Sequence, residues 1–174
     1  MVAKEASANN QPSDPKALQA WRIAATVLDP EVPVLTIEDL GVLRHVEVAG
    51  ETVSVVLTPT YSGCPAIDQM RDDVDTRLRQ AGYKDVSVTY TLSPAWSTDW
   101  MTEDGKRKLK EYGIAPPNAK SSVLSGPIPI TLGVKCPRCD SLMTEEISKF
   151  GSTACKALYR CRACEEPFDY FKVH

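Results

Sequence analysis

The predicted fold is organised around the stretch Thr58-Pro59-Thr60-Tyr61-Ser62-Gly63-Cys64-Pro65-Ala66. It ends an apolar, β-branched run and precedes a long amphipathic pattern, which predicts a tight turn at the start of a helix. The cysteine of this turn, Cys64, would meet unpaired backbone N–H groups and the positive end of the helix dipole. Both favour the thiolate, the form of cysteine that binds metals and attacks electrophiles. The alternative is that Cys64 packs beneath the turn.

Alternating apolar residues on both sides of this stretch predict strands. Residues 42–48 and 53–57 alternate around a short turn that contains Gly50, which favours a β-hairpin. Beyond the cysteine, apolar residues recur at helical spacing over 67–78, and Gly82 is suited to cap that helix. Residues 86–90 alternate again and predict a third strand.

The N-terminal part of the chain predicts one more helix. Asp14 is suited to its N-cap and Pro15 to its first turn, the apolar face continues to Leu28, and Pro30 would end it. The extended connector that follows carries two carboxylates, Asp29 and Glu31, which the residues alone assign to a solvated turn. The order α-β-β-α-β predicts a small α+β domain with its helices on one face of a sheet.

Composition shifts divide the rest of the chain. Ser97 or Thr98 is suited to cap a further, polar helix that would run to Tyr112, and four prolines follow within fourteen residues. We therefore expect a disordered tail over 1–13, the α/β domain over 14–114, a Pro-rich linker over 115–133 and a C-terminal zinc ribbon over 134–174.

Four cysteines in the C-terminal part have the spacing of a metal site. They form two C-x2-C pairs separated by 21 residues: Cys136, Cys139, Cys161 and Cys164. Four thiolates complete a tetrahedral zinc site, and a segment of about 40 residues needs such a site because its core is too small to fold alone. An iron–sulfur cluster with the same ligands and a pair of redox dithiols are the alternatives.

The last two candidate ligands have ordinary explanations. Cys155 could be a reactive thiol or an alternative ligand, but a lone cysteine is more often a small buried residue. His174 could bind metal, although it is the last residue of the chain.

Composition excludes several classes of function. The 174 residues are 43% hydrophobic with a net charge of −3, and no apolar run reaches the length of a membrane span. Residues 135–174 hold seven Lys or Arg and six Asp or Glu, which is too balanced for nucleic acid binding. The N-terminus lacks the pattern of a secretory signal, so we expect a cytoplasmic protein without nucleic acid or membrane partners.

Three motifs occur in order between Pro15 and Tyr90. They are Asp29-Pro30-Glu31-Val32-Pro33-Val34, Ile37-x-Asp39-Leu40-Gly41 and Thr58-x-Thr60-x-x-Gly63-Cys64-Pro65. Together they resemble the iron–sulfur-assembly domain family that includes SufT. The resemblance implies the α/β fold predicted above and a role in the late delivery or maturation of iron–sulfur clusters. It also implies that Asp29, Glu31 and Cys64 border the functional site and that Cys64 handles a transient iron ion or cluster.

Further motifs extend the resemblance over nearly the whole chain. They are Pro94-Ala95-Trp96, Gly113-Ile114-Ala115-Pro116-Pro117 and the cysteine block from Cys136 to Lys172. These resemble the PaaD family, which is encoded with the multicomponent phenylacetyl-CoA epoxidase of phenylacetate catabolism. The resemblance implies an accessory subunit that assists maturation of that complex, with its reductase or oxygenase subunits as partners.

Two other functions and one question of assembly stay open from the residues. A thiol enzyme would use Cys64 as a nucleophile or redox centre, and although no histidine is near it in the sequence, His45 could approach it in space. A structural adaptor would use no chemistry at all. A homodimer also stays open, because a single cysteine cannot hold a cluster that normally needs four protein ligands.

Overall fold

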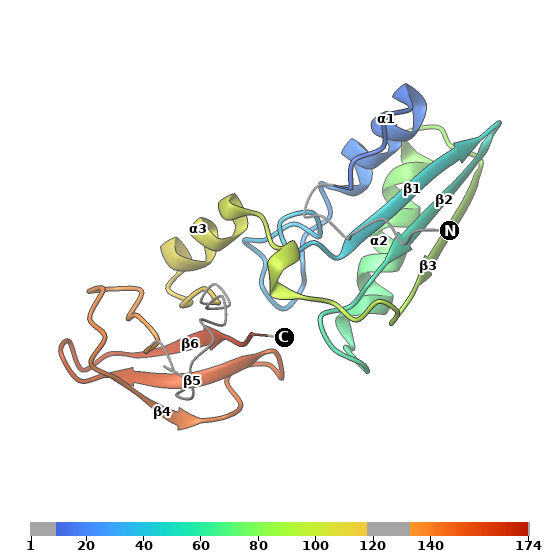
Figure 1. Cartoon of the computed structure of the whole chain (residues 1–174). Helices are drawn as coiled ribbons and strands as arrows, with labels where there is room; N and C mark the ends of the chain where they lie inside the picture. The colour runs from blue at the N-terminus through green and yellow to red at the C-terminus, as the bar shows by residue number, and fades with distance from the viewer. Residues whose placement is uncertain (1–9, 118–132, 174) are drawn as a thin grey trace, which may run out of the picture. The chain divides into compact units, whose positions relative to one another are not determined.

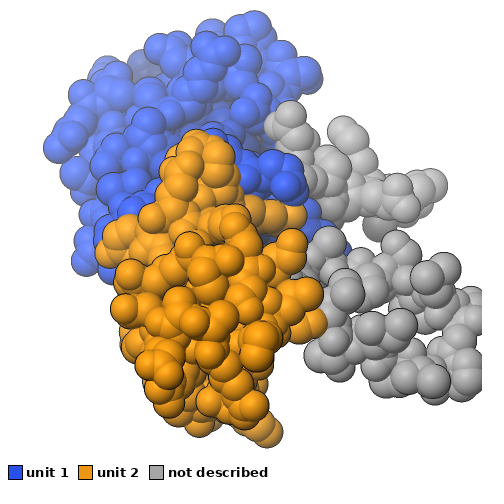
Figure 2. Space-filling view, turned by 90° about the vertical axis from the view of Figure 1, so that its left-hand side faces the viewer, with its two compact units in different colours: residues 1–105 blue, residues 106–174 orange. Residues whose placement is uncertain are grey.

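The computed structural model describes residues 10–117 and 133–173 and divides the chain into two compact units (Figures 1 and 2). The units are residues 1–105 and 106–174, and each holds one three-stranded sheet. The predicted α+β class is therefore confirmed. Among the helices of the described residues, none combines the length and the apolar character needed to cross a membrane.

The predicted domain limits are only partly covered by the description. The tail over 1–13 and the Pro-rich linker over 115–133 lie mostly outside the described residues, so these limits stay predictions. The predicted limit at 114 also stays a prediction, although the second compact unit already begins at 106 and includes most of helix α3 (Glu103–Tyr112).

The first unit contains the predicted elements in the predicted order. They are α1 (Pro15–Ala24), β1 (Leu43–Ala49), β2 (Thr52–Leu57), α2 (Ala66–Gln80) and β3 (Asp85–Tyr90). Strands β1 and β2 form the antiparallel hairpin, and β3 lies parallel to β2. Both helices lie on one face of this sheet (Figure 1). On β2, Val53 and Val55 are accordingly buried and Ser54 is exposed.

Helix α1 begins as predicted but ends earlier. The Asp14 carboxylate accepts a hydrogen bond from the Ala17 N–H at 2.8 Å, which caps the first turn. The prediction that the helix continues to Pro30 is wrong. Its last residue is Ala24, because the Val27 N–H bonds the Ala24 carbonyl and tightens the chain into a turn. Leu28 is therefore removed from the apolar face and is 45% exposed.

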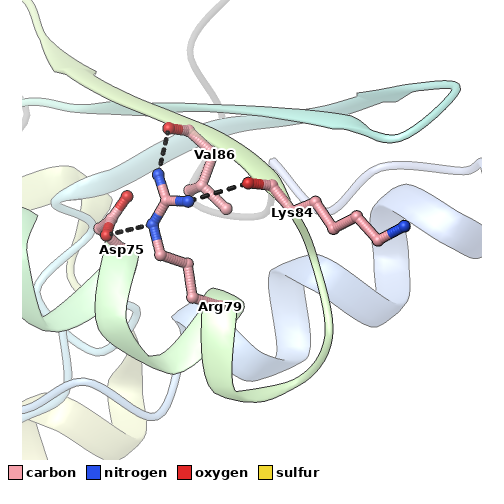
Figure 3. Close-up of polar contacts among 4 residues, drawn as sticks. All are labelled: Asp75, Arg79, Lys84 and Val86. Atoms are coloured by element: carbon pink, nitrogen blue, oxygen red, sulfur yellow. Dashed lines mark hydrogen bonds and ion pairs between the residues drawn. The ribbon is translucent and has the colours of Figure 1, made fainter.

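The C-terminal end of α2 fixes the position of β3. Arg79 donates from Nε to the Asp75 carboxylate at 2.7 Å, and its other nitrogens donate to the carbonyls of Lys84 and Val86 at 2.9 and 3.3 Å (Figure 3). Gly82 takes a φ of +100°, which confirms the predicted helix cap. One guanidinium group thus joins the helix to the strand that follows it.

The segment after β3 holds two elements instead of the single helix predicted. Ser97 caps a short 3-10 turn over Thr98–Trp100, and α3 follows separately. The chain is extended at Met101, and the Thr102 hydroxyl oxygen accepts the Gly105 N–H at 2.9 Å. The helix therefore starts anew with Thr102 as its cap, because the extended residue cannot continue the earlier turn.

The second unit contains an antiparallel ribbon. Its strands are β4 (Thr144–Ser148), β5 (Lys156–Cys161) and β6 (Pro167–Phe171). Ala115 adds a parallel bridge beside β6, donating to the Asp169 carbonyl and accepting from the Phe171 N–H at 2.8 and 2.9 Å. The core is small, with Phe168 and Ala115 packed beside two of the cysteines. A core of this size needs an additional source of folding energy.

Candidate functional site

The turn that carries Cys64 connects β2 directly to α2. Thr58 leaves the strand with its N–H bonded to the Val42 carbonyl at 2.8 Å, and Gly63 takes a φ of +84°, which favours glycine. Helix α2 then begins at Ala66, and its first cap position, Pro65, supplies no side-chain hydrogen bond. The predicted strand–turn–helix is therefore present, with the thiol two residues before the helix.

The loop after α1 holds both predicted carboxylates within electrostatic range of the Cys64 turn. The negative charges of Glu31 and Asp29 act through space on the Cys64 thiol, although 32 residues lie between Glu31 and Cys64 in the chain. The prediction of a solvated turn is wrong for Asp29, which is buried. Its Oδ1 accepts the N–H groups of Glu31 and Val32 at 2.6 and 2.9 Å, which compensates the carboxylate for the lost water.

The environment of Cys64 favours the neutral thiol. Burial is the largest effect on its pKa and raises it, and the negative charges of Glu31 and Asp29 raise it further. The Ala66 N–H and the Tyr61 side chain form hydrogen bonds with the sulfur that lower the pKa, but by less. The predicted preference for thiolate at the helix start is therefore outweighed, and the residue is only 6% exposed.

Two residues near the turn differ from the sequence-based expectations. Tyr61 contacts the sulfur, a role the sequence did not indicate, although it is the one aromatic residue of the turn. His45, the candidate partner of a nucleophilic thiol, is exposed on β1, with its Nε2 3.7 Å from the Glu47 carboxylate. The structure thus places a tyrosine at Cys64 and pairs this histidine with a glutamate.

The motif Asp39-Leu40-Gly41 serves as an anchor for the segment that follows β3. The Trp96 indole donates to the Leu40 carbonyl at 2.9 Å, and Thr102 donates its N–H to the Asp39 carbonyl at the same distance. A Cβ on Gly41 would lie 2.5 Å from the Trp100 carbonyl oxygen. This motif therefore requires glycine for a close packing contact.

The four predicted ligands form a compact sulfur cluster in the second unit. All four Sγ atoms lie within 4.8 Å of one another, with Cys136 and Cys164 at 3.7 Å and Cys139 and Cys161 at 3.5 Å. Zn–S bonds of about 2.3 Å in a tetrahedron separate the sulfurs by about 3.8 Å, so the cluster fits a zinc ion. Disulfides are excluded, because they need about 2.05 Å. Zinc held here would supply folding energy.

The two cysteine turns have matching backbone geometry. The N–H groups of Cys136 and Cys161 each bond the carbonyl five residues ahead, both at 3.0 Å. Asp140 and Glu165, which each follow the second cysteine of a pair, have positive φ values of 57° and 61°. Backbone N–H groups of Cys164 and Ala163 lower the pKa of Cys161 to about 6, against an opposing effect of burial. The backbone thus favours the thiolate at Cys161, whereas burial and the neighbouring sulfurs raise the pKa of Cys139 and Cys164.

Of the two remaining candidate ligands, Cys155 does not join this cluster. Cys155 is buried, and its sulfur lies 3.0 Å from the Thr153 hydroxyl oxygen. It is thus the small buried residue that its isolation in the sequence predicted. His174 lies outside the described residues, so its role as a ligand stays a prediction.

Comparison with known proteins identifies the family. A protein of Escherichia coli (strain K12), named as a subunit of a "Putative 1,2-phenylacetyl-CoA epoxidase", is 49% identical over 158 residues, which cover 91% of this chain and 93% of the relative. Residues 127–172 match the PaaD zinc beta ribbon domain. The chain belongs to the PaaD family.

The first unit of this PaaD-family chain also has relatives of its own. Residues 21–90 match the iron–sulfur cluster assembly protein family. A "Fe-S protein maturation auxiliary factor" of Porphyromonas gingivalis is 37% identical over 90 residues, covering 51% of this chain and 85% of the relative. A crystal structure of a domain of unknown function from Bacillus anthracis matches with a TM-score of 0.50 and 25% identity, over 53% of this chain and 90% of that one.

Proposed function

We propose that this protein is an accessory maturation subunit of a phenylacetyl-CoA epoxidase and that it assists assembly of the iron or iron–sulfur centres of that complex. The name of the E. coli relative supports the epoxidase, and the assembly family matched by residues 21–90 supports maturation. The observation that carries the proposal is that the Cys64 thiol lies just before α2 and senses the negative charges of Glu31 and Asp29.

The same charges that suppress the thiolate favour a bound cation. Glu31 and Asp29 raise the pKa of Cys64 in the free protein because a thiolate beside them adds like charge. An arriving iron ion reverses this balance, so the sulfur loses its proton as the iron binds. Cys64 is one thiol, and the described residues around it form no group of three metal ligands, so this chain alone does not supply the four protein ligands of a cluster. Iron therefore passes through this site as cargo, and the client protein supplies the remaining ligands.

The ribbon has a different task in this proposal. Its four cysteines hold structural zinc and so keep the second unit folded, independently of the cargo. We assign it to docking of a component of the epoxidase, either the reductase or the oxygenase. The chain would then combine a site that passes iron on with a domain that binds a component of the epoxidase.

The test replaces the native copy with Cys64→Ser in cells grown on phenylacetate. We expect the reductase component isolated from these cells to contain less iron and fewer clusters per polypeptide than that from wild-type cells. Cys155→Ser is the matched control, because it changes a buried cysteine of the other unit. A full cluster complement in the Cys64→Ser cells contradicts the role of the thiol.

A structural adaptor is the second candidate, and the low exposure of Cys64 favours it. In that case Cys64→Ser leaves the metal content of the epoxidase unchanged, while deletion of the whole protein lowers the yield of the assembled complex. A thiol enzyme has less support, because burial and two carboxylates raise the pKa of its nucleophile.

A further inference from the structure

The second unit contains an open cavity between the end of helix α3 and the first cysteine turn. Its volume is about 520 Å³. It is lined by residues from the helix end and from the turn, which are Lys110, Glu111, Tyr112, Gly113, Pro137 and Arg138. All of these residues belong to the same compact unit. A cavity of this size can admit several side chains of another molecule.

The two walls of the cavity are fixed by contacts inside the unit. The Lys110 Nζ atom lies 2.6 Å from the Asp140 carboxylate, which joins the helix to the cysteine turn. Beyond the helix, Ala115 forms the bridge to β6. In the turn, the Asp140 N–H bonds the Cys136 carbonyl at 3.0 Å. The lining side chains therefore come from an ordered backbone, which lowers the entropic cost of binding a partner.

Arg138 is the charged side chain of the cavity that has no counter-charge. Its guanidinium is exposed and forms no hydrogen bond or ion pair with any of the described residues. The other two charges that line the cavity are paired. Lys110 is paired with Asp140, and Glu111 with Arg107 at 2.6 Å. Arg138 therefore leaves the cavity with a positive charge.

The second cysteine turn gives a comparison. Its basic residue, Arg162, donates from Nε to the Glu145 carboxylate at 3.0 Å, so its charge is neutralised within the ribbon. Residues 118–132, which connect the two walls of the cavity in sequence, contain no Asp or Glu that could do the same for Arg138. Lys135, just before the first cysteine, is a second exposed cation without an ion pair among the described residues. This positive charge is local, because the whole chain carries a net charge of −3.

The chemistry of the cavity favours a protein carboxylate. A guanidinium with all its donors free can form two parallel hydrogen bonds with one carboxylate. The end of α3 opposes an anion only weakly, because two of its last carbonyls already accept backbone N–H groups. Leu109 accepts from Ile114 at 2.9 Å, and Lys110 from Gly113 at 3.0 Å. The ribbon as a whole is too balanced in charge to favour a nucleic acid.

We propose that this cavity binds an acidic segment of the epoxidase component that docks on the ribbon, and that Arg138 holds a carboxylate of that segment. This inference rests on the proposed function, because docking by the ribbon is part of it. The aromatic ring of Tyr112, which is 55% exposed, supplies an apolar contact beside the charge pair. The zinc ion fixes the turn that carries Arg138, so docking depends on the metal.

The test measures affinity between the purified, zinc-loaded full-length protein and each purified subunit of the epoxidase. We expect at least one subunit to bind, and Arg138→Gln to weaken that binding at least tenfold. Arg162→Gln is the matched control, because it removes the same charge from the other cysteine turn. It should bind within twofold of wild type. Added salt should weaken binding of the wild-type protein more than binding of Arg138→Gln.

Four results overturn the proposal. The first two are failure of every subunit to bind the wild-type protein and equal binding by Arg138→Gln. The third is loss of zinc from Arg138→Gln, which would assign this cation to the charge of the four thiolates. The fourth is tight binding of a single-stranded oligonucleotide that Arg138→Gln abolishes, which would make a nucleic acid the occupant.

Cys64→Ser separates this inference from the proposed role of the thiol. This variant should bind the subunit as tightly as wild type while it lowers the iron content of the reductase. Docking at Arg138 and iron transfer at Cys64 can therefore each fail without the other.

Discussion

In the ribbon, four sulfurs lie within 4.8 Å of one another, and backbone N–H groups lower the pKa of Cys161 to about 6. In the first unit, Cys64 is buried next to Glu31 and Asp29, and its pKa is raised. Cys161 and Cys64 are therefore under opposite conditions. Backbone N–H groups favour the thiolate at Cys161, although burial and the neighbouring sulfurs raise the pKa of Cys139 and Cys164, whereas burial favours the neutral thiol at Cys64.

This contrast distinguishes a structural metal site from the proposed site of metal transfer. A site with four converging ligands binds zinc tightly enough to determine whether its surroundings fold. In the proposed function Cys64 contributes a single thiol to iron, because the described residues form no second metal-binding group, so iron would be held weakly and released. The chain would then keep zinc in one unit while iron passes through the other.

The strongest test of the difference between the two units is to remove the zinc from the ribbon. Cys161→Ser, or a strong chelator, should abolish the fold of the ribbon completely, because structural zinc contributes about 10–16 kcal/mol to domains of this kind. The first unit should remain folded, since the four clustered ligands all lie in the second. Amide NMR spectra with measured zinc content test both statements. Cys155→Ser should retain the metal, and a folded ribbon without metal would contradict the prediction.

The next largest effect concerns the packing of the first unit, which relies on close contacts instead of metal. Gly41→Ala combines a φ of +69° with a Cβ placed 2.5 Å from the Trp100 carbonyl oxygen. We expect it to lower the free energy of unfolding by about 3 kcal/mol or more. Gly63→Ala is the matched control, because its φ of +84° is similar but nothing lies near the added atom. It should cost about 1 kcal/mol in the same denaturant titration.

Much of the fold was predictable because the signals were local. Asp14 and Gly82 mark helix ends through their own backbone chemistry, and alternation over 53–57 identifies a strand regardless of what covers it. The two predictions about helices that were wrong both concern how far a helix continues. Helix α1 stops at Ala24 and a new helix starts after Thr102, because local turns there interrupt patterns that look continuous in the sequence.

The candidate site shows a different limit. The cysteine spacing was sufficient to identify the ribbon cluster, since two C-x2-C turns bring their own ligands together. The pKa of Cys64 was predicted in the wrong direction, because helix position is visible in the sequence whereas burial and the approach of Glu31 are not. The contact of Tyr61 with the sulfur depends on the shape of the turn, so the sequence could not reveal it.

The pH dependence of Cys64 tests the first half of the contrast. Glu31→Gln should lower the pKa of this thiol, because it removes a negative charge, but burial should still keep the pKa above its ordinary value of 9.0. Alkylation by iodoacetamide below pH 9 should therefore be faster in the variant, measured in zinc-loaded protein that also carries Cys155→Ser. Glu47→Gln, on the exposed pair with His45, should leave the rate unchanged.

The same shift predicts how stability depends on pH. A thiol whose pKa is raised by folding holds its proton more tightly in the native state, so its contribution is fully present below the ordinary value of 9.0. It is lost as the pH rises through the higher native pKa. Denaturant titrations of the first unit above pH 9 should show this loss, and it should be smaller in Glu31→Gln. An equal loss in both proteins would remove the carboxylate from the explanation.

The smallest effect concerns the backbone that prepares the ribbon for its metal. Glu165 has a φ of 61°, a conformation that glycine adopts without strain, so Glu165→Gly should stabilise the zinc-loaded ribbon by less than about 1 kcal/mol. Asp140→Gly relieves similar strain in the other cysteine turn but removes the carboxylate that lies 2.6 Å from Lys110 Nζ. The midpoint temperature of thermal unfolding should therefore rise more for Glu165→Gly than for Asp140→Gly. If both variants instead lose zinc more readily, the acidic side chains themselves, rather than the backbone alone, help to keep the metal in place.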